Sequence, residues 1–194
     1  MNKQSGFTLI ETLIAIFLLT LTVGALLQLA AGGFYSVRYA RNQMVATALL
    51  QESLEYMHSS RDTASIAGTD WQTWLTSFSV NQNGTPIGDT SQGCFSRNGC
   101  IVDPYTTVAK VRACDSTCPP ITFFTSSGLY GYSSSTYLPI NGQSVTSGTA
   151  TSYVRTITMQ INTPDQVTVN TSVTWLNGSS SKTVTQPVLL TKWK

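Results

Sequence analysis

The sequence of 194 residues predicts an α+β fold, in which a long N-terminal helix packs against a C-terminal antiparallel β-sheet. Three patterns predict this fold. Residues 12–37 carry no charge, residues 46–57 repeat apolar side chains at helical spacing, and residues 153–190 alternate apolar and polar side chains. A sheet packed on an amphipathic helix would bury the apolar faces of both.

The uncharged run 12–37 is long enough to cross a bilayer. As a helix it would span roughly 39 Å at about 1.5 Å per residue, more than a hydrocarbon core of about 30 Å. A short polar leader with Lys3 precedes the run and ends at Gly6. An ordinary secretory signal is cut after its apolar region. Here the small residue lies before the run, so cleavage would leave the apolar helix in place.

Glu11 is the one charged residue between residues 7 and 37. A charge at the middle of a membrane helix costs about 2.5 to 3.5 kcal/mol for Asp, Lys or Arg, and such residues persist where they have a partner or a function. Glu11 is either hydrated near the interface or paired. Cleavage after Gly6 would create a protonated amine at Phe7, which a neighbouring copy could offer to Glu11.

The N-terminal residues Gly6-Phe7-Thr8-Leu9-Ile10-Glu11, followed by an apolar helix, resemble the class III signal of type IV prepilins and type II secretion pseudopilins. Residues 46–62 and 173–193 are similar to the second half of the helix and the closing hairpin of minor pilins. The resemblance implies that a membrane peptidase cuts between Gly6 and Phe7 and N-methylates Phe7. It also implies that Glu11 neutralises the terminus of a neighbouring subunit and that the fold is pilin-like.

We expect four segments along the chain. These are a prepilin leader at 1–6, a transmembrane and assembly half-helix at 7–37, an amphipathic half-helix at 38–62, and an extracytoplasmic β-rich domain with long Ser/Gly/Asn loops at 63–194. One helix would run from residue 7 to about His58, and the alternative breaks it at Gly32 and Gly33. The apolar stripe of the second half is Ala46, Leu49, Leu50, Ser53, Leu54 and Met57.

Strands are predicted at residues 106–112, 121–124, 153–161, 167–175 and 184–190. Asn177 and Gly178 mark a turn before the last of them. Pro187 within that last strand indicates a sheet edge or a bulge, because proline has no N–H for the ladder. The four tryptophans are expected to anchor the core or its rim: Trp71, Trp74, Trp175 and Trp193.

The four cysteines all follow the apolar helix. They allow three pairings, of which we favour the local pairs Cys94 with Cys100 and Cys114 with Cys118. A four-thiolate zinc site is the alternative, but such sites favour other spacings; free thiols are a further one. No cofactor and no metal are expected.

A structural role is predicted, and an enzyme is not. His58 is the only histidine, and no nucleophile, base and orienting group can be assembled around it. The resemblance implies a subunit of a type IV pilus-like filament, a minor pilin. The alternatives are a pseudopilin of a type II secretion or DNA-uptake system and a membrane-tethered adhesin or binding domain that does not polymerise.

The expected partners follow from that role. They are other pilin subunits, the prepilin peptidase and methyltransferase, the inner-membrane pilus assembly machinery and, before assembly, the lipid bilayer. A formal net charge of +2 without a basic stripe gives no support to nucleic-acid binding. The chain is expected to be a single-pass membrane protein with an extracytoplasmic C-terminal domain, and then part of a cell-surface filament.

Overall fold

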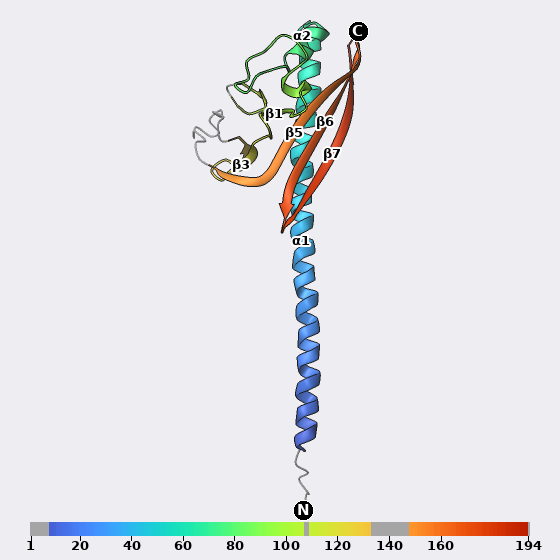
Figure 1. Ribbon diagram of the computed structural model, residues 1–194, viewed down its shortest axis with the longest axis vertical. Helices are drawn as coiled ribbons and strands as arrows, with labels where there is room; N and C mark the ends of the chain where they lie inside the picture. The colour runs from blue at the N-terminus through green and yellow to red at the C-terminus, as the bar shows by residue number, and fades with distance from the viewer. Residues whose placement is uncertain (1–7, 107–108, 133–147, 194) are drawn as a thin grey trace, which may run out of the picture. The chain divides into compact units, whose positions relative to one another are not determined.

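The computed structural model describes residues 8–106, 109–132 and 148–193. The chain divides into two compact units, Met1–Gln43 and Met44–Lys194. Figure 1 labels the helices and strands. The first unit contains the N-terminal part of helix α1, and the second contains the remaining elements.

Helix α1 is continuous from Leu9 to Ile66. The alternative of a break at Gly32 and Gly33 is therefore wrong. Each glycine costs about 1 kcal/mol in a helix relative to alanine, and the helix-forming residues on both sides outweigh that cost. In the first unit, every described residue from Thr8 to Arg38 is exposed.

The predicted helix end near His58 is also wrong, because α1 continues to Ile66. The end is a glycine-based cap. Gly68 adopts a φ of 69°, and the N–H of Thr69 donates to the carbonyl of Ala64 at 2.9 Å. This is the Schellman arrangement, in which a left-handed glycine lets the chain turn back over the last helical turn. The polar residues at 59–63 are accommodated within the helix instead of ending it.

Seven strands form one antiparallel sheet in the described residues. They are β1 (Cys100–Val102), β2 (Val111–Ala113), β3 (Pro120–Phe124), β4 (Leu129–Gly131), β5 (Thr149–Thr163), β6 (Gln166–Asn177) and β7 (Ser180–Thr191). Strand β5 lies at the centre. It pairs with β6 along one edge and with β1 and β3 along the other, while β7, β2 and β4 lie outside β6, β1 and β3. The short helices are α2 (Trp71–Thr76) and the 3-10 turn η1 (Gly93–Phe95).

The predicted α+β class and the three long C-terminal strands are confirmed. The turn between β6 and β7 contains Gly178 at a φ of 65°, and β7 is an edge strand whose Pro187 faces Asn170 without a bulge. Of the strand predicted at 106–112, residues 107 and 108 lie outside the described residues, and β2 begins only at Val111. The three-residue strands β1 and β4 and helix α2 are too short to give a periodic pattern, and the sequence did not predict them.

The core of the second unit lies between the sheet and the C-terminal part of α1. The helix buries Ala46, Leu49, Leu50, Ser53 and Met57, whereas the predicted Leu54 is half-exposed. Strands β5 and β6 contribute alternate side chains to the same core.

The predicted role of the tryptophans is confirmed. Trp71, Trp74 and Trp175 are buried, and Trp193 packs against the core. The ring of Trp71 stacks on that of Trp74 at a centroid distance of 5.0 Å and meets the edge of Trp193 at 5.5 Å. The indole N–H of Trp74 donates to Ser60 on α1 at 3.0 Å, which fixes α2 to the last turns of the long helix.

Candidate functional site

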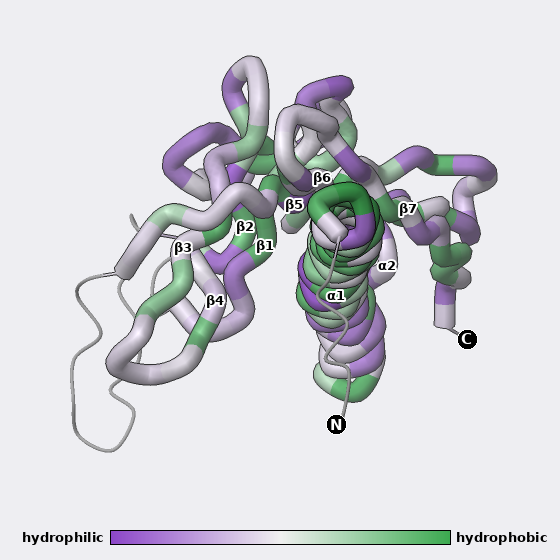
Figure 2. Tube along the Cα trace, turned by 90° about the horizontal axis from the view of Figure 1, so that it is seen from below, coloured by the Kyte–Doolittle hydropathy of each residue, from purple (hydrophilic) through white to green (hydrophobic). Residues whose placement is uncertain are grey.

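The first candidate site is the apolar segment of α1 in the first unit. Figure 2 colours the Cα trace by hydropathy, with hydrophobic stretches of α1 in green. Leu9, Leu29 and Phe34 are 80%, 75% and 73% exposed. Among the described residues, α1 is the one helix long and apolar enough to cross a membrane. A surface of this kind is stable in lipid or against other helices, and not in water.

Hydroxyl groups in this segment bond back to the helix itself. The side chains of Thr12, Thr20 and Thr22 donate to carbonyls three residues earlier, at 2.8 to 2.9 Å. Ser36 donates to Gly32 at 3.2 Å. These side chains therefore need no hydrogen-bond partner outside the helix, and they add little cost in an apolar environment.

Glu11 differs from these hydroxyls. It lies in the first turn of α1, where its backbone N–H donates to the carbonyl and side chain of Thr8. Its carboxylate is the one charge between Leu9 and Val37 and is exposed. In an apolar environment such a group requires a partner. Gly6 and Phe7 lie outside the described residues, so the predicted cleavage, methylation and pairing stay predictions.

The second candidate site is a buried polar cluster around Arg155 in the second unit. Arg155 lies on β5 at an inward position of the alternation and is 2% exposed. Its guanidinium donates to the carbonyl of Leu49 at 2.9 Å, to Glu52 Oε2 at 2.7 Å and to the carbonyl of Val102 at 2.5 Å. One side chain thus joins α1, β1 and β5.

Tyr132 and Asp103 complete the cluster, and both are buried. Burial raises the pKa of the Tyr132 hydroxyl, although the charge of Arg155 and a hydrogen bond to it act in the opposite direction. Burial alone would lower the pKa of Arg155, but Tyr132 and Glu52 outweigh that effect and raise it. The cluster therefore links the helix to the sheet through one charged side chain.

The sequence analysis missed Arg155. The signal was present, because the strand pattern places residues 153, 155, 157 and 159 on one face. An arginine at a core position of a strand requires a buried acceptor. Glu52 is not part of the predicted apolar stripe, but it borders the buried face of the helix.

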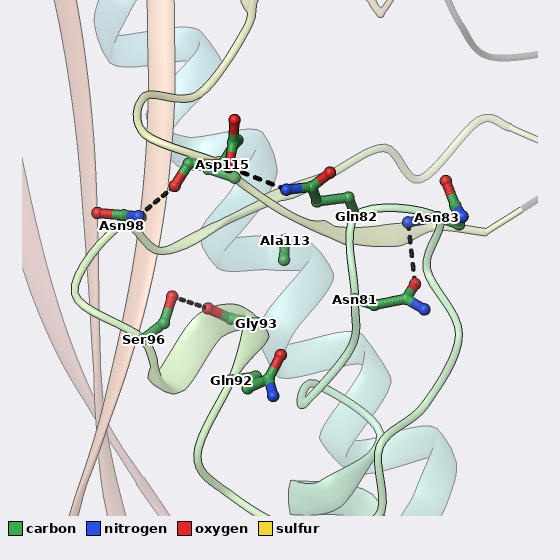
Figure 3. A pocket seen from close by; sticks show the side chains of 10 residues that line it. Asn81, Gln82, Asn83, Gln92, Gly93, Ser96, Asn98, Ala113 and Asp115 are labelled. Atoms are coloured by element: carbon green, nitrogen blue, oxygen red, sulfur yellow. Dashed lines mark hydrogen bonds between the residues drawn. The ribbon is translucent and has the colours of Figure 1, made fainter.

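The third candidate site is a polar pocket that Figure 3 shows from close by. It is lined by Asn81, Gln82, Asn83, Gln92, Gly93, Ser96, Asn98, Ala113, Cys114 and Asp115. Several of these groups hold one loop to another. Gln82 donates to the carboxylate of Asp115 at 3.0 Å, and the side chain of Asn98 donates to the backbone carbonyl of Asp115.

Two disulfides fix the loops around this pocket. They join Cys94 with Cys100 and Cys114 with Cys118, the pairs that the sequence analysis favoured. In the part of the chain that the structure describes, no group of three or more His, Cys, Asp or Glu side chains could hold a metal ion.

Comparison with known proteins identifies the N-terminal segment. Residues 1–27 match the family described as the prokaryotic N-terminal methylation motif. No curated protein and no solved structure matches the chain. The motif points to a structural subunit and not to an enzyme, and it implies processing by prepilin peptidase, membrane anchoring before assembly and assembly with other pilins. Residues 1–27 therefore carry the class III signal of type IV pilins, and in this chain the signal precedes a long helix and an antiparallel sheet.

Proposed function

We propose that the chain is a structural subunit of a type IV pilus-like filament, a minor pilin. Its leader is removed after Gly6, the new terminal Phe7 is N-methylated, and the apolar segment anchors the chain until it enters the filament. One observation carries the proposal: Glu11 is a lone carboxylate in an exposed apolar helix whose hydroxyl groups bond to their own backbone.

The exposed apolar side chains require a cover that changes during assembly. In the membrane, lipid covers the segment between Leu9 and Val37. In a filament, the same segments of neighbouring subunits would cover each other in a helix bundle. Both environments are apolar, so the transfer changes little for the leucine and isoleucine side chains.

The transfer from membrane to filament changes the environment of the Glu11 carboxylate most. In a bundle it would be removed from water, and a buried charge without a partner costs about 3 to 5 kcal/mol. The protonated amine of a neighbour's Phe7 would be the partner. Helices shifted along their axes bring the terminus of one chain to the first turn of the next, where Glu11 lies.

The experiment compares Glu11→Ala with Thr12→Val in cells that assemble the filament. The measurement is the amount of this protein in sheared filaments relative to membranes. The amount of the Glu11→Ala variant in filaments should fall at least tenfold. The substitution leaves the neighbour's amine without a partner in the bundle, which costs more than the 1.4 kcal/mol that corresponds to a tenfold change. Thr12→Val alters a neighbouring side chain that bonds only to Leu9, and it should assemble normally.

Two further readouts separate the steps. Glu11→Gln should give an intermediate or equal defect, because it keeps the shape and loses the charge. All variants should insert in the membrane and fold, since residue 11 belongs to the other unit. Incorporation of Glu11→Ala at the wild-type level would favour a simple membrane tether over a filament subunit.

Processing is tested separately by mass spectrometry of the N-terminal peptide. The mature chain should begin at N-methylated Phe7, and replacing Gly6 by a bulkier residue should block trimming. A mature chain that retains Met1, or one that begins beyond Ala31, would contradict the proposal. A pseudopilin would share this processing, and the location of the assembled protein, at the cell surface or within the envelope, separates it from a pilin.

A further inference from the structure

A groove in the second unit lies between the C-terminal part of α1 on one side and Tyr105 with the start of β4 on the other. It is lined by Val45, Ala48, Leu49, Gln51, Glu52, Glu55, Tyr105, Gly128, Leu129 and Tyr130. The lining combines two carboxylates, two phenol rings and aliphatic side chains. No Lys or Arg side chain lines it. This is the composition of a site for a cationic side chain, because carboxylates and aromatic faces both attract cations.

The two carboxylates of the groove differ. Glu52 is bonded to the buried Arg155 at 2.7 Å and is 22% exposed, so its charge is offset inside the domain. Glu55 is exposed, and the described part of the chain gives it no ion pair. The groove therefore has an uncompensated negative charge at Glu55.

The aromatic side of the groove is held in place. The phenol of Tyr105 is hydrogen-bonded to Glu52, and the ring remains 43% exposed. Tyr130 lies against Phe123 at a centroid distance of 4.9 Å. Burial, and then the nearby carboxylates Glu52 and Glu55, raise the pKa of Tyr105. The groove is thus preformed, which lowers the entropy cost of binding.

Two cations lie where the apolar segment of α1 ends, and neither has an ion pair among the described residues. Arg38 and Arg41 are both exposed and lie three residues apart on the helix. Residues at this spacing share one helix face. Glu52 and Glu55 have the same spacing. Two parallel helices could therefore align both arginines of one with both carboxylates of the other.

We propose that this groove is a subunit interface that receives Arg38 and Arg41 from the helix of a second copy, with Arg41 against Glu55 and Arg38 beside Glu52 and Tyr105. The inference rests on the proposed filament function, requires that copies of this chain lie next to each other in the filament, and adds the contact that follows the apolar segment. Within a filament the arginine side chains would lose contact with water. The carboxylates and tyrosine rings of the groove would replace those interactions, since a carboxylate can accept two hydrogen bonds from one guanidinium and an aromatic face attracts a cation. The parallel order of the two pairs matches subunits that all point in the same direction.

Charge reversal tests the contact in the full chain. Glu55→Arg should lower the amount in sheared filaments by roughly tenfold or more, because like charges facing each other cost several kcal/mol. Adding Arg41→Glu should restore most of the loss, since the pair is then reversed. Ser59→Arg adds a charge one turn away on the same helix, and it is the control that should assemble normally. Glu52 is left intact because it holds Arg155.

Cross-linking identifies the occupant. Cells co-expressing Arg41→Cys and Glu55→Cys should give a covalent dimer in filaments with a short bismaleimide, and either variant alone should not. Wild-type incorporation of Glu55→Arg would overturn the inference. A defect that Arg41→Glu does not relieve, with no cross-link, would overturn the second copy as occupant and assign the groove to another subunit. If Glu11→Ala fails to assemble while Glu55→Arg assembles normally, the proposed filament function stands and only the contact at this groove is rejected.

Discussion

The two units of the chain obtain their stability from different sources. In the first unit, the described residues up to Arg38 are exposed, and the hydroxyl groups of the segment bond to their own helix. In the second, one buried arginine, two disulfides and a core shared by helix and sheet hold the structure. The domain should therefore respond to mutation as a folded protein does, and the apolar segment should respond only in lipid or in an assembly.

The largest effect is expected at Arg155. Arg155→Met should destabilise the domain by about 3 to 5 kcal/mol, because it leaves Glu52 and buried carbonyls without their donor. Denaturant unfolding of the detergent-solubilised chain, followed by tryptophan fluorescence, measures the change. Arg61→Met is the control, since its pair with Asp62 is on the surface and such pairs contribute about 0 to 1 kcal/mol. Equal effects of the two variants would contradict the assigned role of Arg155.

Substitutions in the two parts of α1 should have different effects on the stability of the domain. Met57→Ala should cost about 2 to 5 kcal/mol, because Met57 is fully buried and its removal leaves a cavity. Leu18→Ala should change domain stability by less than about 0.5 kcal/mol, because Leu18 is exposed. The measurement is again denaturant unfolding. A similar loss of stability in both variants would show that the apolar segment contributes to the fold of the domain, and that the two units do not differ in the source of their stability.

The disulfides should contribute less. Each closes a short loop, with sequence separations of 6 and 4, for which loop-closure entropy predicts about 2 kcal/mol each. Paired Cys→Ser variants test the magnitude. In protein isolated without reductant, thiol labelling of the unfolded chain should find no free cysteine. Two or more reactive thiols, or stoichiometric zinc, would contradict the pairing.

The smallest effect is expected at Asp89. Its carboxylate accepts from the N–H and hydroxyl of Ser91 and from the hydroxyl of Ser79, which lowers its pKa below the usual value. The stabilisation is therefore present above the pKa of the unfolded chain and is lost as the pH falls through the lower folded value. Asp89→Asn should lower Tm slightly at neutral pH, and the difference from wild type should vanish in acid. A difference independent of pH would contradict this assignment.

The sequence predicted the elements that have a long and regular pattern. The uncharged run, the stripe 46–57 and the alternation in β5 to β7 each extend over several turns or pairs, so their periods are readable. The end of α1 was misjudged because Ser59, Ser60 and Asp62 are typical of caps, whereas tertiary contacts such as that of Ser60 with Trp74 keep them helical. The Gly68 cap gave a better signal than these polar residues.

The buried cluster could not be assembled from local patterns. Arg155, Glu52 and Val102 meet only because β5 pairs with β1 and its inward side chain reaches the helix, and no single segment of the sequence shows this arrangement. The loops that line the polar pocket have no period, and two disulfides position them. Glu11, however, could be identified from the sequence alone, because it is a charged residue among uncharged neighbours.

The tryptophan cluster has a consequence for the order of events during synthesis. Trp193 packs against Trp71 and Trp74, and Leu190 is fully buried in the same core. The packing of the core is therefore incomplete until these C-terminal residues have left the ribosome. The apolar segment emerges first and is available for membrane targeting while the domain is still unfolded. The tertiary structure of the domain would then be completed only after the apolar segment has become available to the membrane.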